Sequence, residues 1–97
     1  MELKQILEKK REKILEIASK HGAFNIRIFG SVARGEETEN SDIDFLIDYD
    51  LQKISPWFLT GLITDLEELL ERKVDVITVK SLHYFIRYKI LKEAINL

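Results

Sequence analysis

The segment Ser41-Asp42-Ile43-Asp44-Phe45-Leu46-Ile47-Asp48 decides how this chain folds. Apolar and acidic residues alternate along most of it, which is the period of a β-strand with one buried face. The apolar side chains supply that face, so Asp42 and Asp44 share the opposite one, with Cα atoms roughly 6.6 Å apart. Two carboxylates side by side on a half-buried strand repel each other unless a cation lies between them.

A divalent cation would relieve this repulsion, and hard oxygen ligands favour Mg²⁺. A calcium loop of the EF-hand kind is excluded, because Ile43, Phe45 and Leu46 stand where such a loop needs polar residues and glycine. The alternative is that Asp42 and Asp44 are surface residues of an edge strand. The pair of aspartates alone leaves both interpretations open.

A third carboxylate lies further along the chain, in Lys73-Val74-Asp75-Val76-Ile77. The β-branched residues around Asp75 predict a strand over 73–79, and aspartate is disfavoured in the middle of a strand. If this strand neighbours strand 41–48, Asp75 faces the same site as Asp42 and Asp44 and completes a cluster of three carboxylates. The alternative is an exposed strand face on which Asp75 pairs with Lys73.

Upstream, a strand predicted over 24–29 ends at Gly30-Ser31. Glycine allows the backbone to approach a ligand closely, and the amides at a helix start point toward an anion. Ser31 adds a hydroxyl donor. A Gly-Ser pair by itself is a common turn, but here it stands between a strand and a second strand that carries paired carboxylates. A phosphate site beside a magnesium site is the arrangement that phosphoryl and nucleotidyl transfer require.

The remaining apolar residues recur at helical spacing, which predicts helices over 2–20, 55–72 and 81–95. With a short helical turn at 31–34, the order is α-β-(short α)-β-α-β-α. We therefore predict an α+β fold, with a three-stranded mixed sheet and helices packed on one face, in a single domain over residues 1–97. Phe24, Ile26 and Ile28 are expected on one face of the first strand. The last helix carries two apolar stripes, of which one packs on the sheet and the other is free for an interface.

Composition excludes several classes of function. The 97 residues include no cysteine, so a disulfide framework and a thiolate metal site are ruled out. The net charge of −2 argues against a general nucleic-acid binder. No apolar run reaches the ~20 residues of a membrane span, and the charged N-terminus is unlike a signal peptide. We expect a cytoplasmic protein. The acidic residues gathered over 36–50 indicate a bound cation, a basic partner surface or a solvated loop.

Taken together, these motifs resemble the signature of the minimal nucleotidyltransferases of the DNA polymerase beta-like superfamily. The resemblance rests on Gly30-Ser31-Val32-Ala33-Arg34-Gly35, the ten residues between Ser31 and Asp42, and the acidic strand that follows. It extends over nearly the whole chain. It implies that Gly30 and Ser31 bind the triphosphate of ATP. The role of Arg34 is open between a phosphate contact and a pairing with the acidic loop.

The same resemblance implies that Asp42, Asp44 and Asp75 are catalytic and bind Mg²⁺, with two ions expected. A hydroxyl would attack the α-phosphate of ATP and release pyrophosphate. Some members of the superfamily, of the MntA type, are antitoxins of HEPN/MNT toxin–antitoxin pairs. We therefore expect a protein adenylyltransferase that modifies a hydroxyl, such as that of a tyrosine, on a HEPN toxin.

Two other functions are weighed against this expectation. The first is a non-catalytic antitoxin or binding module that neutralises its partner by occlusion; three clustered carboxylates argue against it, since a binding surface has no need of them. The second is nucleotidylation of a small molecule, which requires an acceptor pocket that so short a chain is not expected to build. A second copy of the chain or a partner protein is expected to complete the open side of the site.

Overall fold

A four-stranded sheet forms the centre of the protein in a computed structural model, which describes residues 2–97. The strands are β1 (Ala23–Phe29), β2 (Ile43–Tyr49), β3 (Val74–Thr78) and β4 (Ile95–Asn96), in the order β3-β2-β1-β4. β1 runs antiparallel to β2 and β4, whereas β2 and β3 are parallel. The predicted α+β class with a mixed sheet is confirmed. The prediction missed β4, because a strand of two residues is too short to show a period.

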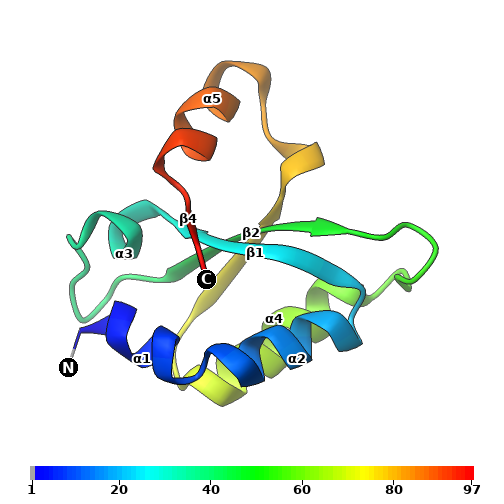
Figure 1. Ribbon diagram of the computed structural model, residues 1–97, viewed down its shortest axis with the longest axis horizontal. Coiled ribbons are helices and arrows are strands. Elements are labelled where there is room, and N and C mark those ends of the chain that lie inside the picture. Colours follow the sequence, from blue (N-terminus) through cyan, green and yellow to red (C-terminus); the bar gives the residue numbers. More distant parts are fainter. Residues whose placement is uncertain (1) are drawn as a thin grey trace.

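Three helices cover one face of the sheet: α1 (Leu3–Lys9), α2 (Arg11–Lys20) and α4 (Phe58–Leu70) (Figure 1). The single helix predicted over 2–20 is divided at Lys10, which leaves the helical backbone at φ −97° and ψ 10°. The bend allows Leu7 and Ile14 both to reach the core. Lys10 Nζ also donates to the Leu69 carbonyl at 3.0 Å, which satisfies a free acceptor in the last turn of α4.

The main core lies between these helices and the sheet. The largest side chains fully buried in it come from α1, α2, β2 and α4, namely Leu7, Ile14, Ile43, Phe45, Ile47, Leu62 and Leu66. Full burial of each such side chain stabilises the fold by about 1.5–3 kcal/mol. The apolar face predicted for strand 41–48 is thus the core face, and its acidic residues lie on the other side.

A bulge in β1 corrects one prediction. Phe24 was expected on the core face with Ile26, but half of its surface is exposed. Between them Asn25 has φ 50°, a left-handed conformation that asparagine adopts more readily than most residues, and the pairing with β2 shifts register there. The extra residue turns Phe24 away from the core.

The last helix, α5 (Tyr84–Glu93), lies on the opposite face of the sheet from α1, α2 and α4 (Figure 1). The prediction had placed all helices on one face. The reason for the difference is a second, smaller apolar cluster on the other face, formed by Phe29, Leu46 and Leu82 with Ile77, Val79, Ile90 and Ala94. The 3₁₀ turn η1 (Val79–Ser81) leads into α5, so the helix begins later than the predicted residue 81.

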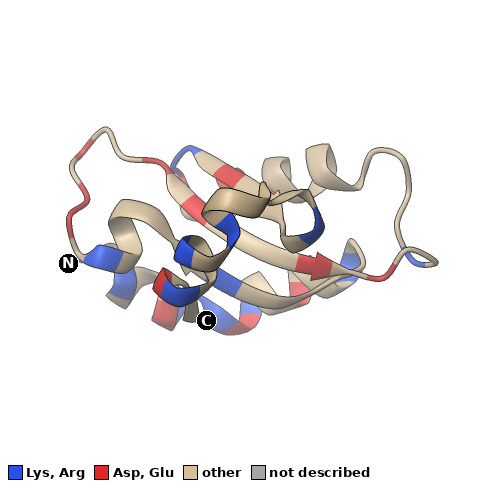
Figure 2. Ribbon diagram, turned by 90° about the horizontal axis from the view of Figure 1, so that it is seen from above, with Lys and Arg blue, Asp and Glu red and all other residues tan. Residues whose placement is uncertain are grey.

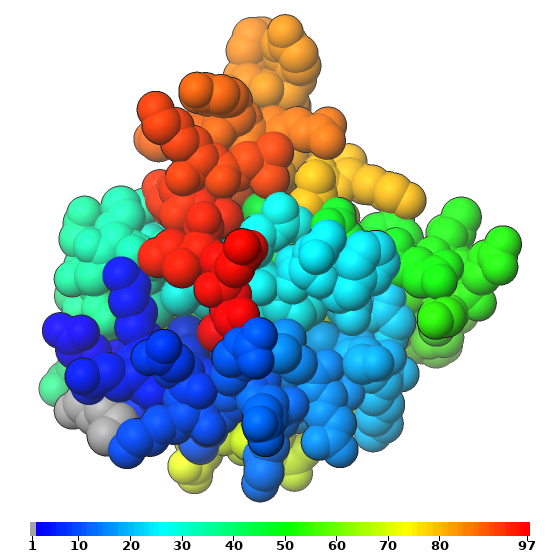
Figure 3. All heavy atoms as spheres, viewed as in Figure 1, coloured from blue at the N-terminus to red at the C-terminus, as the bar shows by residue number. Residues whose placement is uncertain are grey.

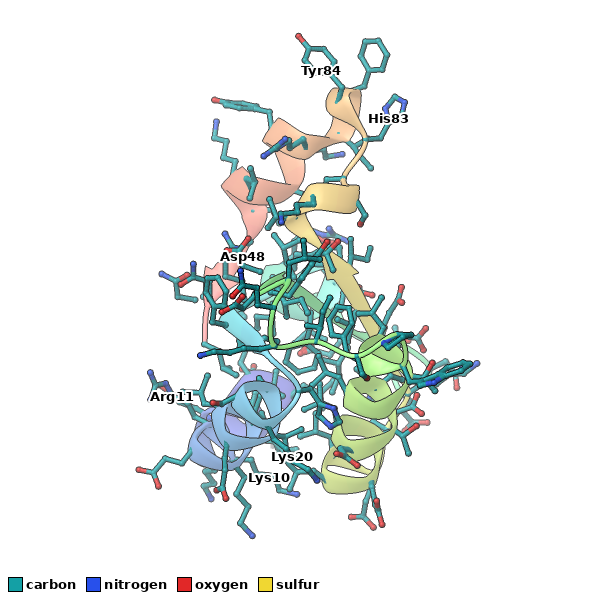
Figure 4. All side chains as sticks on the ribbon, turned by 90° about the vertical axis from the view of Figure 1, so that its right-hand side faces the viewer. Lys10, Arg11, Lys20, Asp48, His83 and Tyr84 are labelled. Carbon is teal, nitrogen blue, oxygen red and sulfur yellow. The ribbon has the colours of Figure 1, made fainter. Side chains whose placement is uncertain are left out.

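The far part of α5 stands clear of the rest of the molecule (Figure 3). Its largest side chains, Tyr84, Phe85 and Tyr88, are 83%, 81% and 75% exposed. Tyr84 and the preceding His83 lie at the end of the molecule opposite Lys10 and Lys20 (Figure 4). Of the two apolar stripes predicted for this helix, the one with Ile90 packs on the sheet and the one with Tyr84 and Tyr88 is free. No helix within residues 2–97 is long and apolar enough to cross a membrane.

Candidate active site

The parallel pairing of β2 and β3 brings two of the predicted site residues together. Asp44 lies directly opposite Asp75 in the register of the two strands. Neighbouring strands are about 4.8 Å apart, and residues in register on parallel strands project from the same face. That face is the one over which α5 lies. Asp44 is half-buried and Asp75 is exposed. The predicted adjacency of these two strands is therefore present in the fold.

The environment of Asp44 disfavours a negative charge. Burial raises the pKa of this carboxyl above its ordinary value of 3.8, and the charges of Asp75 and Asp42 raise it further. Arg34 opposes the effect, whereas Glu93 adds to it. A cation bound among these oxygens would reduce the repulsion and favour the ionised form.

The carboxylates suit magnesium, although the described part of the chain contains no close group of three or more acidic or histidine side chains that could hold a metal by itself. Mg²⁺ is usually bound by one or two carboxylates together with substrate phosphates and water. The Asp44–Asp75 pair meets that requirement, with Asp42 preceding β2 at the end of a loop. Ligation by all three residues remains a prediction.

Arg72, which follows α4, holds the loop that carries Asp42 by two hydrogen bonds. Arg72 Nε donates to the Ser41 carbonyl at 2.9 Å, and the Arg72 guanidinium also donates to the carbonyl of Thr38. Within the loop, the Thr38 amide donates to Ser41 Oγ at 2.8 Å. Arg72 was not identified from the sequence, because it is 31 positions from Ser41 and no local pattern links the two.

The predicted phosphate turn lies beside Asp44. Gly30 begins the short helix α3 (Gly30–Arg34) with φ +74°, and the space that a Cβ atom would need is taken by Asp44 Oδ2. Ser31 follows and is half-buried, while Val32 and Ala33 anchor the turn in the core. Gly30 thus lies next to Asp44, and Ser31 follows it in the chain. Triphosphate binding by these two residues stays a prediction.

Glu93, the last residue of α5, reaches this turn and was not identified from the sequence. The Gly30 amide donates to Glu93 Oε1 at 2.6 Å, and Arg34 Nη1 donates to the same oxygen at 2.9 Å. The hydrogen bond with Glu93 raises the pKa of Arg34. Arg34 Nε also contacts Glu36 at 3.4 Å, so in this structure Arg34 pairs with acids. One signal was available: a glutamate in the last turn of a helix opposes the helix dipole and needs another partner.

Charge on this side of the molecule is divided between the sheet and the helix above it. Figure 2 shows acidic positions along the strands beside basic positions of α5. Asp48 lies further along β2 (labelled in Figure 4), where Arg27 Nη2 and Asn25 Nδ2 donate to Oδ2 at 3.2 and 3.0 Å. Since these donors come from β1, Asp48 stabilises the sheet near the bulge.

Known proteins resemble this chain in sequence. The sequence model of the nucleotidyltransferase domain family matches residues 4–97. A curated relative from Methanocaldococcus jannaschii, named "Putative protein adenylyltransferase MJ0435", is 43% identical over 86 residues, 89% of this chain and 91% of the relative. "Protein adenylyltransferase MntA" of Thermococcus cleftensis is 35% identical over 80 residues, which cover 82% of this chain and 80% of that protein.

Solved structures agree with the sequence comparisons. One described as a "putative minimal nucleotidyltransferase" superposes with a TM-score of 0.85 and 38% identity, covering 96% of this chain and 94% of the other. A toxin–antitoxin structure with AMP-PNP shares the fold at a TM-score of 0.72 and 22% identity, over 92% of this chain and 70% of that one. The chain belongs to the nucleotidyltransferase domain family and is a nucleotidyltransferase of the minimal type.

Proposed function

We propose that this protein is a magnesium-dependent protein adenylyltransferase that uses ATP and acts as the antitoxin of a HEPN-family toxin. The observation that carries the proposal is the pairing of Asp44 with Asp75 beside Gly30. A pair of carboxylates next to a tight strand-to-helix turn fits a nucleoside triphosphate and its metal, and the surroundings of Asp44 disfavour a negative charge there.

Each residue has a distinct role in the proposal. Gly30 and Ser31 bind the triphosphate, and Asp42, Asp44 and Asp75 hold Mg²⁺. The metal, when bound, supplies positive charge to the phosphates and to the leaving pyrophosphate. The acceptor oxygen attacks the α-phosphorus, the bond from that phosphorus to pyrophosphate breaks, and the hydroxyl proton passes to solvent water.

Of the paired carboxylates Asp44 and Asp75, Asp75 is the more accessible to an incoming acceptor, because it is exposed whereas Asp44 is half-buried. An acceptor approaching from solvent therefore meets Asp75 before it meets Asp44. We assign to Asp75 the orientation of the attacking hydroxyl.

A protein acceptor is supported by the names of the relatives and by the free face of α5. Tyr84, Phe85 and Tyr88 are exposed on the same side of the sheet as Asp44. Large aromatic side chains are enriched at protein interfaces. The choice of a HEPN toxin, and of a tyrosine hydroxyl on it, follows from the resemblance to MntA-type antitoxins.

The test is a transfer assay with the purified product of the gene adjacent to this chain's gene, Mg²⁺ and ATP labelled on the α-phosphate. We expect label on the partner with the wild type and none with Asp44→Asn. ATP labelled on the γ-phosphate is the control and should leave the partner unlabelled, which distinguishes nucleotidyl transfer from phosphorylation. Asp48→Asn, on the same strand face but paired with Arg27, should retain transfer.

The occlusion alternative makes the opposite prediction. If the two proteins form a tight complex and no α-phosphate label is transferred under any condition, the chain neutralises its partner by binding alone. Competition by unlabelled GTP, CTP and UTP in the same assay would establish the base preference.

A further inference from the structure

The carboxylate of Glu93 occupies the hydrogen-bond donors that an anion at Gly30 would use. Glu93 Oε1 accepts from the Gly30 amide at 2.6 Å and from Arg34 Nη1 at 2.9 Å. Charge-assisted hydrogen bonds of this length are among the stronger ones in proteins. A backbone amide has one hydrogen, so a phosphate oxygen and the Glu93 carboxylate cannot both use it fully.

A pocket of about 270 Å³ borders this contact, lined by Phe29, Gly30, Arg34, Ile86, Lys89, Ile90 and Glu93. Two of these residues, Arg34 and Lys89, are cationic, and Glu93 is the one anion among them. While Glu93 is in place, it neutralises part of the positive charge. Once it leaves, the Gly30 amide and the Arg34 guanidinium are free to receive another anion.

Glu93 also adds to the negative charge around Asp44 and helps to raise the pKa of that carboxyl. The nucleotide-free site therefore carries one more carboxylate than the proposed chemistry needs. Displacing Glu93 both frees donors for a phosphate group and relieves repulsion at Asp44.

We propose that Glu93 is an internal competitor of the nucleotide: its carboxylate occupies the phosphate position at Gly30 and Arg34 in the free protein, and a metal-bound polyphosphate must displace it to bind. This inference rests on the proposed triphosphate site. Glu93 is a specificity-determining residue in this scheme, because only a ligand with enough negative charge replaces a carboxylate that is already in contact.

The displacement is expected to affect the end of the chain. Glu93 is the last residue of α5, and Ala94 leads directly into β4, whose two residues pair with Arg27 and Ile28 of β1. So short a strand contributes few hydrogen bonds to oppose a shift. Nucleotide binding should therefore change the environment of the amides of Ala94 and Ile95 as well as that of Gly30.

The first test is calorimetric titration with the magnesium complex of AMP-PNP, and separately with magnesium pyrophosphate. Glu93→Gln keeps the size of the side chain and removes its charge. We expect its Kd for each probe to fall by at least about 5-fold, because a neutral acceptor competes less well for the Gly30 amide and Arg34. Glu68→Gln, at an exposed position of α4 on the other face of the sheet, is the matched control and should bind like the wild type.

Equal affinity in Glu93→Gln and the wild type would overturn the inference and leave the proposed function standing. Weaker binding by the variant would also overturn it, since Glu93 would then support the site. If neither the wild type nor any variant binds either probe, the chain has no such nucleotide site and both proposals fail. Melting curves for Glu93→Gln establish that the variant is folded.

Amide NMR gives a second measurement that does not depend on affinity. In the wild type, adding the magnesium complex of AMP-PNP should shift the Gly30, Ala94 and Ile95 resonances together. In Glu93→Gln the Gly30 resonance should already be displaced before nucleotide is added. A Gly30 resonance that responds while Ala94 and Ile95 do not would show that the end of α5 stays in place, against the inference.

Discussion

The carboxylate of Asp44 fills the space beside Gly30 that any larger residue at position 30 would need. Two independent reasons therefore require glycine at this turn: its φ of +74°, and the close approach of Asp44 Oδ2. The contact connects the end of β1 to the start of β2. It makes the phosphate turn and the carboxylate pair parts of one site.

Gly30→Ala tests this contact, and Gly35→Ala is its matched control. Gly35 has nearly the same φ, +72°, but nothing lies within 4 Å of the Cβ position. Gly35→Ala should lose only about 1 kcal/mol from left-handed strain. Gly30→Ala should lose more and should displace Asp44, so that transfer falls below detection while Gly35→Ala remains active. Equal melting temperatures and activities in the two variants would contradict the observed packing.

Removing the charge of Asp44 should stabilise the protein in the absence of metal. The folded-state pKa of Asp44 is raised by burial and by neighbouring acids, so its ionised form costs stability at neutral pH. For Asp44→Asn we expect a rise in melting temperature of at most about 4 °C, since the group is only partly buried and solvent screens it. Differential scanning calorimetry without divalent ions measures this.

The pH dependence of that gain has a definite sign. Because the raised pKa is that of the folded state, the cost is full above it and disappears as the pH falls below the ordinary carboxyl pKa of 3.8. The difference between Asp44→Asn and the wild type should therefore vanish in acid. Magnesium should raise the melting temperature of the wild type and leave that of the variant unchanged. A large destabilisation in Asp44→Asn would mean that the acid is structural.

Asp65 should behave in the opposite way. His21 Nε2 lies 2.7 Å from Asp65 Oδ2, and this hydrogen bond lowers the pKa of the carboxyl. Its contribution to stability is therefore present above the ordinary carboxyl pKa and is lost as the pH falls through the folded-state pKa. Asp65→Asn should melt at a lower temperature than the wild type at neutral pH, with the gap closing in acid, and should retain transfer activity. Thermal melts across this range, run beside Asp44→Asn, would show the two trends.

Arg72→Ala should reduce activity without unfolding the protein. Its guanidinium fixes the carbonyls of Thr38 and Ser41, directly before Asp42. Loss of these contacts loosens the loop and displaces Asp42. We therefore expect roughly 10–100-fold lower transfer by Arg72→Ala, the size of effect seen when the partners of metal ligands are removed. A lysine cannot donate to both carbonyls in the planar geometry of a guanidinium, so the transfer activity of Arg72→Lys should lie between those of the wild type and Arg72→Ala. If Arg72→Ala retains full activity, the loop does not need these hydrogen bonds to position Asp42.

Much of the fold followed from local periodicity. The alternation in 41–48 predicted β2 and its buried side. The helical spacing in 55–72 predicted α4, although the helix itself spans only Phe58–Leu70. The break at Lys10, the bulge at Asn25 and the position of α5 did not follow. Each depends on what lies across the core or across the sheet, and a local pattern carries no information about that.

The candidate site shows the same division. The spacing of Asp42 and Asp44 and the Gly30-Ser31 turn were visible in the sequence because each lies within one strand or turn. The contacts of Arg72 with Ser41 and of Glu93 with Gly30 join residues 31 and 63 positions apart. Nothing near either residue in the sequence indicates its partner.

By itself, the sequence determined which side chains share a face of each strand, because that alternation is a property of the extended backbone. Only the tertiary structure decided that β3 lies parallel to β2 with Asp75 opposite Asp44, and that α5 brings Glu93 to the Gly30 amide. Strand order and helix placement are set by the free energy of burying apolar surface over the whole chain, so no single segment could specify them.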